Sequence, residues 1–320
     1  MDSRRMVDPE LLPMLDLFPN GRFTAGALAQ TRAGFAALLA EASAAAPDVP
    51  GVAVSERSVP GRDGAPDVRA LVYLPDDAPR PLPALLWIHG GGHVVGVAEQ
   101  SGPTVKRIAA EVGCAVVSVD YRLSPETPFP GQLEDCYAAL AWLRGAFTDL
   151  GVDPDRIAVG GDSAGGGLAA GLALLARDRG EIPLAYQLLI YPMLDDRTAS
   201  TVEPPVMCGE FVWNRDANRF GWNAFLGQEP GGADVSPYAA PARAESLAGL
   251  PPAFIGVGDL DLFAEEDIAY AGRLIRDGVP TELHVYPGAI HGFYNIPGAA
   301  IAEAATGDYL DALRRALRRA

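Results

Sequence analysis

Short apolar runs alternate with longer amphipathic segments along most of the chain. An apolar run that ends at glycine or at a polar cluster is typical of a strand buried on both faces, and apolar residues three or four positions apart are typical of a helix. The predicted strands are Val52–Val59, Val68–Leu74, Ala84–Ile88, Ala115–Val119, Ile157–Val159, Tyr186–Tyr191, Ala253–Val257 and Thr281–Tyr286. The predicted helices are Thr104–Val112, Leu133–Phe147, Leu168–Arg179, Glu265–Asp277 and Ala299–Arg318. This alternation predicts an α/β fold with a mostly parallel, doubly wound sheet covered by helices on both faces.

Two segments do not fit this alternation: residues 1–48, the first cap segment, and residues 194–232, the second cap segment. The first has apolar residues at helical spacing, and the second is rich in aromatic residues, namely Phe211, Trp213, Phe220, Trp222 and Phe225. A local apolar cluster is the simplest interpretation of these aromatics. Because neither segment has strands of its own, we expect them to pack together over the carboxyl edge of the sheet, where such sheets bind ligands. Residues 49–193 and 233–320 then form the two parts of the core.

Composition and charge narrow the class of protein. The chain has 25 Lys+Arg against 41 Asp+Glu, a formal net charge of −16, so nucleic acid is excluded as an expected partner. The odd number of cysteines, 3, implies no disulfide framework. Neither a secretory signal nor an apolar run long enough to span a membrane is present, so we expect a cytoplasmic protein without stable membrane insertion.

The sharpest motif is Gly161-Asp162-Ser163-Ala164-Gly165, which lies between a predicted strand and a predicted helix. A nucleophilic serine on a strained strand-to-helix turn needs glycine on both sides, because a side chain there would collide with the neighbouring backbone. The motif alone also fits a glycine-rich packing turn. Its position in the chain favours Ser163 as a nucleophile.

A serine nucleophile needs a base, most often histidine, and the chain has 4 histidines. His89 and His93 flank a glycine run, and His284 alternates with apolar residues inside a strand. His291 follows the last strand at the edge where Ser163 is expected. By elimination the base is His291, with an ordinary surface-loop histidine as the simpler alternative.

The base needs a carboxylate to hold its tautomer. Asp259 and Asp261 both follow the strand Ala253–Val257, and their spacing does not separate them. Glu265, Glu266 and Asp267 come next, and we interpret them as acids of the first helical turn, which the helix dipole favours.

Backbone N–H groups that stabilise an oxyanion are expected after the third strand, at His89-Gly90-Gly91-Gly92. Gly90 and Gly91 are predicted donors, together with Ala164, the residue after the nucleophile. A phosphate cradle is the alternative interpretation of the glycine run, but no fingerprint of a nucleotide-binding loop accompanies it.

Four motifs in order resemble the hormone-sensitive-lipase-like family of bacterial esterases, in the subgroup marked by G-D-S-A-G. They are His89-Gly90-Gly91-Gly92, Asp120-Tyr121-Arg122-Leu123-Ser124-Pro125-Glu126 with Phe129-Pro130, the serine motif, and His291-Gly292-Phe293. The resemblance runs from about Val52 to the end of the chain. In this family the acid stands about nine residues before a tyrosine, and counting back from Tyr270 gives Asp261, although the segment around it departs from the usual form.

The resemblance implies an α/β-hydrolase fold with about eight strands and a helical cap, a catalytic triad of Ser163, Asp261 and His291, and neither cofactor nor metal. It implies a serine carboxylesterase whose partner is a small-molecule ester, and it is compatible with a homodimer. Asp162 would serve the turn or the cap, and the Asp120–Glu126 segment would form a structural network beside the site.

The aromatic residues of the second cap segment suggest a bounded pocket for short- to medium-chain or aryl esters. We expect Phe211, Trp213, Trp222 and Tyr191 to line it. Hydrolysis of amides, carbamates or lactones on the same triad is the alternative. A non-catalytic small-ligand receptor, as in plant gibberellin receptors, is disfavoured because those receptors lack the triad histidine and this chain has His291.

Overall fold

An eight-stranded sheet forms the centre of the computed structural model, which describes residues 3–17, 23–45 and 49–318. The strands are β1 Val52–Val59, β2 Val68–Pro75, β3 Leu82–Ile88, β4 Ala115–Asp120, β5 Val152–Asp162, β6 Tyr186–Ile190, β7 Ala253–Gly258 and β8 Thr281–Tyr286. Their order in the sheet is β1-β2-β4-β3-β5-β6-β7-β8. β2 is antiparallel to both β1 and β4, and the other neighbours are parallel. The predicted mostly parallel α/β sheet is confirmed.

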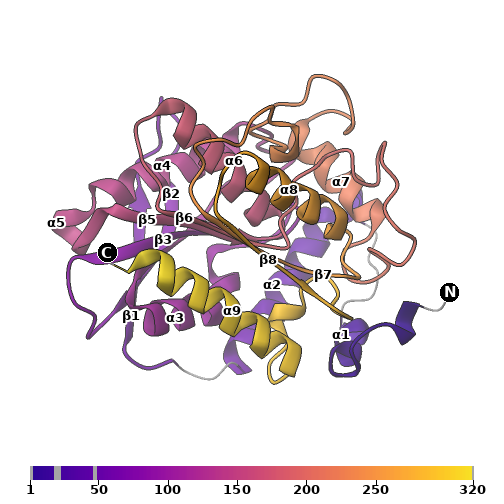
Figure 1. Cartoon of the computed structure of the whole chain (residues 1–320), viewed down its shortest axis with the longest axis horizontal. Helices are drawn as coiled ribbons and strands as arrows, with labels where there is room; N and C mark the ends of the chain where they lie inside the picture. Colours follow the sequence, from indigo (N-terminus) through magenta and orange to yellow (C-terminus); the bar gives the residue numbers. More distant parts are fainter. Residues whose placement is uncertain (1–2, 18–22, 46–48, 319–320) are drawn as a thin grey trace.

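Helices cover both faces of this sheet. They are α1 Leu12–Leu17, α2 Leu28–Ala45, α3 Gly102–Ile108, α4 Gly131–Gly145, α5 Phe147–Leu150, α6 Ala164–Arg179, α7 Arg215–Leu226, α8 Ala264–Arg276 and α9 Ala300–Leu317. Helices α4, α6 and α8 lie on one face of the sheet, and α3 and α9 lie on the other (Figure 1). Their side chains form two separate apolar clusters with the strands, one on each face.

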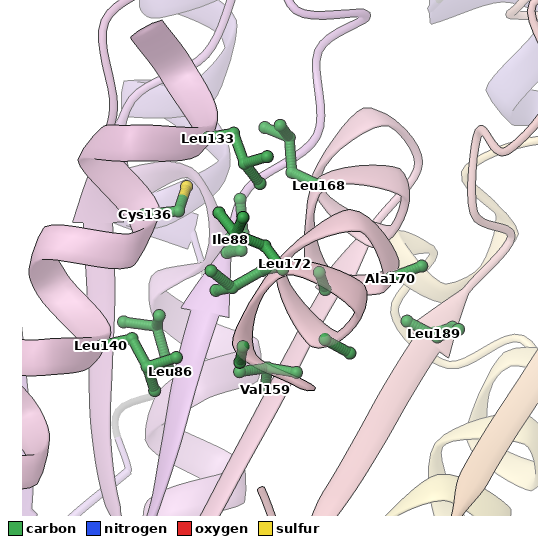
Figure 2. Close-up of a cluster of buried hydrophobic side chains, with 14 of the residues drawn as sticks. Leu86, Ile88, Leu133, Cys136, Leu140, Val159, Leu168, Ala170, Leu172 and Leu189 are labelled. Carbon is green, nitrogen blue, oxygen red and sulfur yellow. The ribbon is translucent and has the colours of Figure 1, made fainter. Parts of the chain in front are cut away.

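The alternation of side chains along β3 explains why it is wholly apolar. Leu86 and Ile88 point to the α4 and α6 side, whereas Leu85 and Trp87 point to the α3 and α9 side, and all four are buried. A strand buried on both faces needs apolar residues at successive positions. Figure 2 shows the α4 and α6 side of this core, where β3 lies beneath Leu133, Cys136 and Leu140 of α4 and Leu168 and Leu172 of α6.

Several boundaries differ from the sequence prediction, and the starts of β5 and α6 have a clear physical reason. β5 begins at Val152 rather than Ile157, because Val152 pairs with Leu82 across a register shift in a polar stretch that has no strand pattern. α6 begins at Ala164 rather than Leu168, and its first turn is made of glycines that have low helix propensity.

The two cap segments contact each other through aromatic side chains. The ring centroid of Phe23, just before α2, lies 5.5 Å from that of Trp213 and 6.2 Å from that of Phe220. The earlier part of the first cap segment packs elsewhere, since Val7 and Leu11 join the core on the α9 side. The division of the chain into cap and core stays a prediction.

The three cysteines are free and buried. Of the helices in the described ranges, none combines the length and the apolar character needed to cross a membrane.

We predict that Leu86→Ala lowers the free energy of unfolding by about 3 kcal/mol, because it leaves a cavity between β3, α4 and α6. Ile275→Ala, at a position on α8 that is 59% exposed, is the control, and its free energy of unfolding should change by less than about 0.5 kcal/mol. Urea denaturation of both variants measures the difference, and equal stability of the two would contradict this description of the core.

Candidate active site

Ser163 lies on the sharp turn between β5 and α6. Its backbone has φ +55° and ψ −122°, a conformation that a residue with a side chain rarely adopts. The Ser163 N–H donates to the carbonyl oxygen of Ile190 at 2.9 Å, and its own carbonyl accepts from the N–H groups of Gly167 and Met193 at 3.0 Å each. Hydrogen bonds to the neighbouring elements therefore hold the strained turn in place.

The glycines of the motif allow the close approach that this turn requires. A Cβ atom on Gly161 would lie 2.3 Å from the Ile88 carbonyl oxygen, and one on Gly165 would lie 2.0 Å from the same atom. Both distances are far below van der Waals contact. From the sequence, glycine is expected here because a side chain would collide with the neighbouring backbone, and these distances show that collision.

A continuous chain of hydrogen bonds joins Ser163, His291 and Asp261. The distance from His291 Nε2 to Ser163 Oγ is 2.9 Å, and that from His291 Nδ1 to Asp261 Oδ2 is 2.8 Å. An acceptor-only carboxylate assigns the imidazole proton to Nδ1, so that Nε2 accepts the proton of the serine hydroxyl. The three residues follow β5, β7 and β8, whose carboxyl ends meet at one edge of the parallel sheet.

The structure separates the two aspartates that the sequence left open. Asp261 is fully buried, and its second oxygen, Oδ1, accepts the Phe263 N–H at 3.0 Å. Asp259 Oδ1 instead accepts the N–H of Gly288 at 2.7 Å, which ties together the loops that follow β7 and β8. Asp261 is therefore placed to orient His291, and Asp259 is placed to hold the loop that carries it.

Aromatic rings surround the His291 imidazole. The ring centroids of Tyr191, Phe263 and Trp213 lie 4.7, 5.4 and 6.4 Å from that of His291. Ser163 and His291 are only 5% and 7% exposed. The two reacting side chains thus lie in a nearly dry environment, in which their hydrogen bond is strengthened.

The oxyanion loop differs from the prediction at its first glycine. The Gly90 N–H donates to Asp162 Oδ1 at 3.2 Å, so it is already paired, contrary to the expectation that it is free to bind an oxyanion. Within residues 49–318, no protein acceptor pairs with the N–H groups of Gly91, Gly92 or Ala164. Gly92 was not predicted as a donor. The loop has positive φ at Gly91 (+120°) and Gly92 (+57°), a backbone path that glycine permits and that the sequence alone does not specify.

The predicted pocket residues divide into two groups. Trp213 lies directly against the oxyanion loop, since a Cβ on Gly92 would meet its ring at 2.1 Å, and Tyr191 lies beside His291. Trp222 is fully buried near His93, and Phe211 packs against the core on the α9 side. Trp213 and Tyr191 thus adjoin the triad, whereas Trp222 and Phe211 serve packing.

A network behind the oxyanion loop includes a residue that the sequence did not reveal. Arg32 of α2 donates to the carbonyl oxygens of Val94 and Ser124 and to both oxygens of Glu126, each at 2.8 Å. The Tyr121 hydroxyl donates to the His89 carbonyl at 2.9 Å. The Asp120–Glu126 segment therefore anchors both the loop and the first cap segment. No motif surrounds Arg32, so no local signal marks it.

Two acids that we assigned to the helix dipole are instead buried. The Glu266 carboxylate accepts the N–H groups of Leu194 and Asp195 and the hydroxyl of Thr198, and so fixes the start of the second cap segment. Asp267 is fully buried, and burial raises its pKa well above the usual range. Both residues are buried because they lie on the side of α8 that packs against the protein, and the helix dipole does not explain their positions. Only Glu265 is exposed as expected.

Comparisons with known proteins agree with this geometry. A family model described as alpha/beta hydrolase fold matches residues 85–295. The carboxylesterase NlhH of Mycobacterium tuberculosis is 38% identical over 328 residues, which cover 98% of each chain. Among solved structures, a bacterial heroin esterase has a TM-score of 0.91 and 43% identity over 99% of this chain and 100% of that one. The esterase LipW from Mycobacterium marinum has a TM-score of 0.86 and 35% identity over 99% and 98%.

We predict that Gly161→Ala lowers the free energy of unfolding by roughly 3 kcal/mol, because its Cβ would overlap the Ile88 carbonyl. Gly272→Ala is the matched control. It lies in α8 with no atom within 4 Å of the added Cβ and should raise stability by up to about 1 kcal/mol. Thermal and urea unfolding measure both, and a Gly161→Ala protein as stable as the wild type would show that the turn is not crowded.

Proposed function

Because the chain belongs to the hormone-sensitive-lipase-like group of the α/β-hydrolase family, we propose that it is a serine carboxylesterase that works through Ser163, His291 and Asp261. The observation that carries this proposal is the hydrogen-bond chain from Ser163 Oγ through the imidazole to Asp261 Oδ2, with distances of 2.9 and 2.8 Å. The esterases among its relatives support the reaction class.

In the proposed mechanism, each triad residue has a distinct role in acyl transfer. His291 Nε2 takes the proton from Ser163 as Oγ attacks the ester carbonyl, and the buried Asp261 carboxylate stabilises the imidazolium that forms. His291 then protonates the departing alcohol. A water molecule enters, loses its proton to His291 and hydrolyses the acyl-enzyme by the same route.

The tetrahedral intermediates carry a negative oxygen that needs preorganised donors. The unpaired N–H groups of Gly91, Gly92 and Ala164 are the proposed donors, in place of the predicted set that included Gly90. Each such donor contributes on the order of 3 kcal/mol to transition-state stabilisation in other hydrolases. All the groups that the mechanism needs come from the chain itself, so the proposal includes no cofactor.

We extend the proposal to substrate size. Trp213 lies against Gly92, and Tyr191 and Phe263 flank His291, so aromatic rings bound the space on several sides of the nucleophile. These rings lie close to the two reacting side chains, which favours short- to medium-chain acyl groups and flat aryl groups. Long acyl chains would need a longer groove.

Substitutions in the triad should show which of the two aspartates, Asp261 or Asp259, is needed for catalysis. Using p-nitrophenyl acetate, Ser163→Ala should lower kcat/KM by about 10⁴-fold or more, and Asp261→Asn by about 10²- to 10⁴-fold because it favours the wrong imidazole tautomer. Asp259→Asn is the matched control, since its amide oxygen can still accept the Gly288 N–H, and it should retain activity within about threefold. A large loss in Asp259→Asn together with an active Asp261→Asn would overturn the assignment.

The second prediction concerns the acyl chain and the bond that is cleaved. Across p-nitrophenyl esters from acetate to palmitate, kcat/KM should peak at a short or medium chain and then fall, because the rings around Trp213 limit the space. A value that keeps rising to laurate and palmitate would contradict this limit. Matched anilides should react far more slowly than the esters, and faster turnover of the anilides would replace the esterase proposal by an amidase.

A further inference from the structure

Asp162, the residue before the nucleophile, lies between the nucleophile turn and the oxyanion loop. Its Oδ1 accepts the Gly90 N–H at 3.2 Å. The approach is close, because a Cβ on Gly90 would lie 2.6 Å from Asp162 Oδ2 and 3.2 Å from Ser163 Cβ. The triad does not use this carboxyl group, yet it is the group that fixes the first glycine of the loop.

A small cavity lies next to Asp162. Its volume is about 20 Å³, and Asp162, Trp87, Ser101, Thr104 and Tyr191 are among the residues that line it. Trp87 is 2% exposed, and within the described ranges of the chain its indole Nε1–H has no hydrogen-bond partner. A space of this size that offers a donor and a carboxylate fits one water molecule.

Opposing effects act on the pKa of the Asp162 carboxyl group. Burial raises the pKa of its carboxyl to about 6, although the Gly90 N–H and the nearby His291 both favour the charged form. Burial keeps the tyrosines around Asp162 and His89 uncharged near this pH. Burial holds the pKa values of Tyr121, Tyr191 and Tyr294 well above 10, raises that of Tyr309 to about 12, and lowers that of His89.

We propose that Asp162 is a positioning residue for the oxyanion hole, and that its ionised carboxylate holds Gly90 with the help of a water molecule in this cavity. The water accepts the Trp87 N–H and donates to the Asp162 carboxylate. With Gly90 held, the N–H groups of Gly91 and Gly92 point at the reacting carbonyl. This inference rests on the proposed esterase function. It adds the requirement that Asp162, as well as His291, has lost its proton in the active enzyme.

Ionisation of the Asp162 carboxyl group lowers the free energy of unfolding, and this effect depends on pH. The pKa of Asp162 is about 6 in the folded protein against an ordinary value of 3.8, so the folded state binds the extra proton between these pH values. Stability is therefore lost as pH rises from about 4 to 6 and stays lost above. Asp162→Asn should consequently unfold at a higher temperature than the wild type at pH 8, and at a similar temperature at pH 4.

The test is the pH dependence of kcat and kcat/KM for p-nitrophenyl acetate, measured between pH 4 and 9. In the wild type, both His291 and Asp162 must lose a proton, so log kcat/KM should approach a slope of two on the acid side. In Asp162→Asn the slope should fall to one. There kcat should fall about tenfold or more with little change in KM. The neutral amide oxygen accepts the Gly90 N–H more weakly than a carboxylate does, and the amide NH₂ group cannot accept a hydrogen bond from the water, so the loss concerns transition-state stabilisation.

Trp87→Phe tests the water separately, since it removes only the donor of the indole ring. The acid limb should keep its slope of two, and its upper inflection should move to higher pH because the carboxylate loses support. Trp142→Phe, a partly buried tryptophan on α4 that packs against the core, is the matched control and should reproduce the wild-type profile.

The outcomes are distinguishable. An Asp162→Asn protein with wild-type kcat and an unchanged slope would overturn the positioning role, and an unmoved inflection in Trp87→Phe would overturn the water. If Asp162→Asn does not fold, the shift in Trp87→Phe relative to Trp142→Phe still decides the question. A wild type that leaves every ester at the buffer rate, or a Ser163→Ala variant that stays active, would refute the proposed function itself.

Discussion

The backbone turn at Ser163 is the constraint on which the rest of the site depends. A residue with a side chain is held at φ +55° because its N–H and carbonyl groups are paired with Ile190, Gly167 and Met193. Gly161 and Gly165 let the turn approach β3 to distances that no Cβ would permit. Strain of this kind persists only where the surrounding structure over-determines it. The central position of β5 in the sheet, with β3 on one side and β6 on the other, provides that support.

The same sheet edge explains how residues far apart in the chain meet. β5, β7 and β8 run parallel, so the loops after them place Ser163, Asp261 and His291 next to one another. Hydrogen bonds between loops then fix the relative positions. Asp259 ties the β7 loop to Gly288, Asp162 ties the turn to Gly90, and Glu266 ties α8 to the start of the second cap segment. Carboxylates that accept backbone N–H groups from a neighbouring segment thus hold this site at three places.

Parts of the fold and of the site could be predicted from the sequence where a pattern of residues has a single physical cause. Buried strands must be apolar at successive positions, and a strained turn must carry glycine on both sides, so the sheet and the position of Ser163 could be predicted. His291 could be found because few histidines were available. The choice of Asp261 over Asp259 needed either a family resemblance or coordinates, because both follow the same strand and only the path of the loop separates them.

Other features had no local signal. The backbone path of the glycine loop is not specified by its sequence, so the pairing of the Gly90 N–H with Asp162 could not be predicted. The burial of Glu266 and Asp267 depends on how α8 rotates against the sheet, and acids in a first helical turn are usually exposed. Trp222 and Phe211 could not be separated from Trp213, because the sequence does not show which aromatic residues of a cap pack inwards and which adjoin the triad. The role of Arg32 arises from a contact across 94 positions of sequence to Glu126.

The most direct test of the account is covalent labelling by a fluorophosphonate, followed by mass spectrometry of the intact protein and of its peptides. The account predicts one phosphonyl group per chain, located on Ser163, with esterase activity lost in proportion to labelling. It also predicts that His291→Ala labels far more slowly, because Oγ then has no base. Labelling of a different residue, or esterase activity that remains when Ser163 is fully modified, would contradict the central claim.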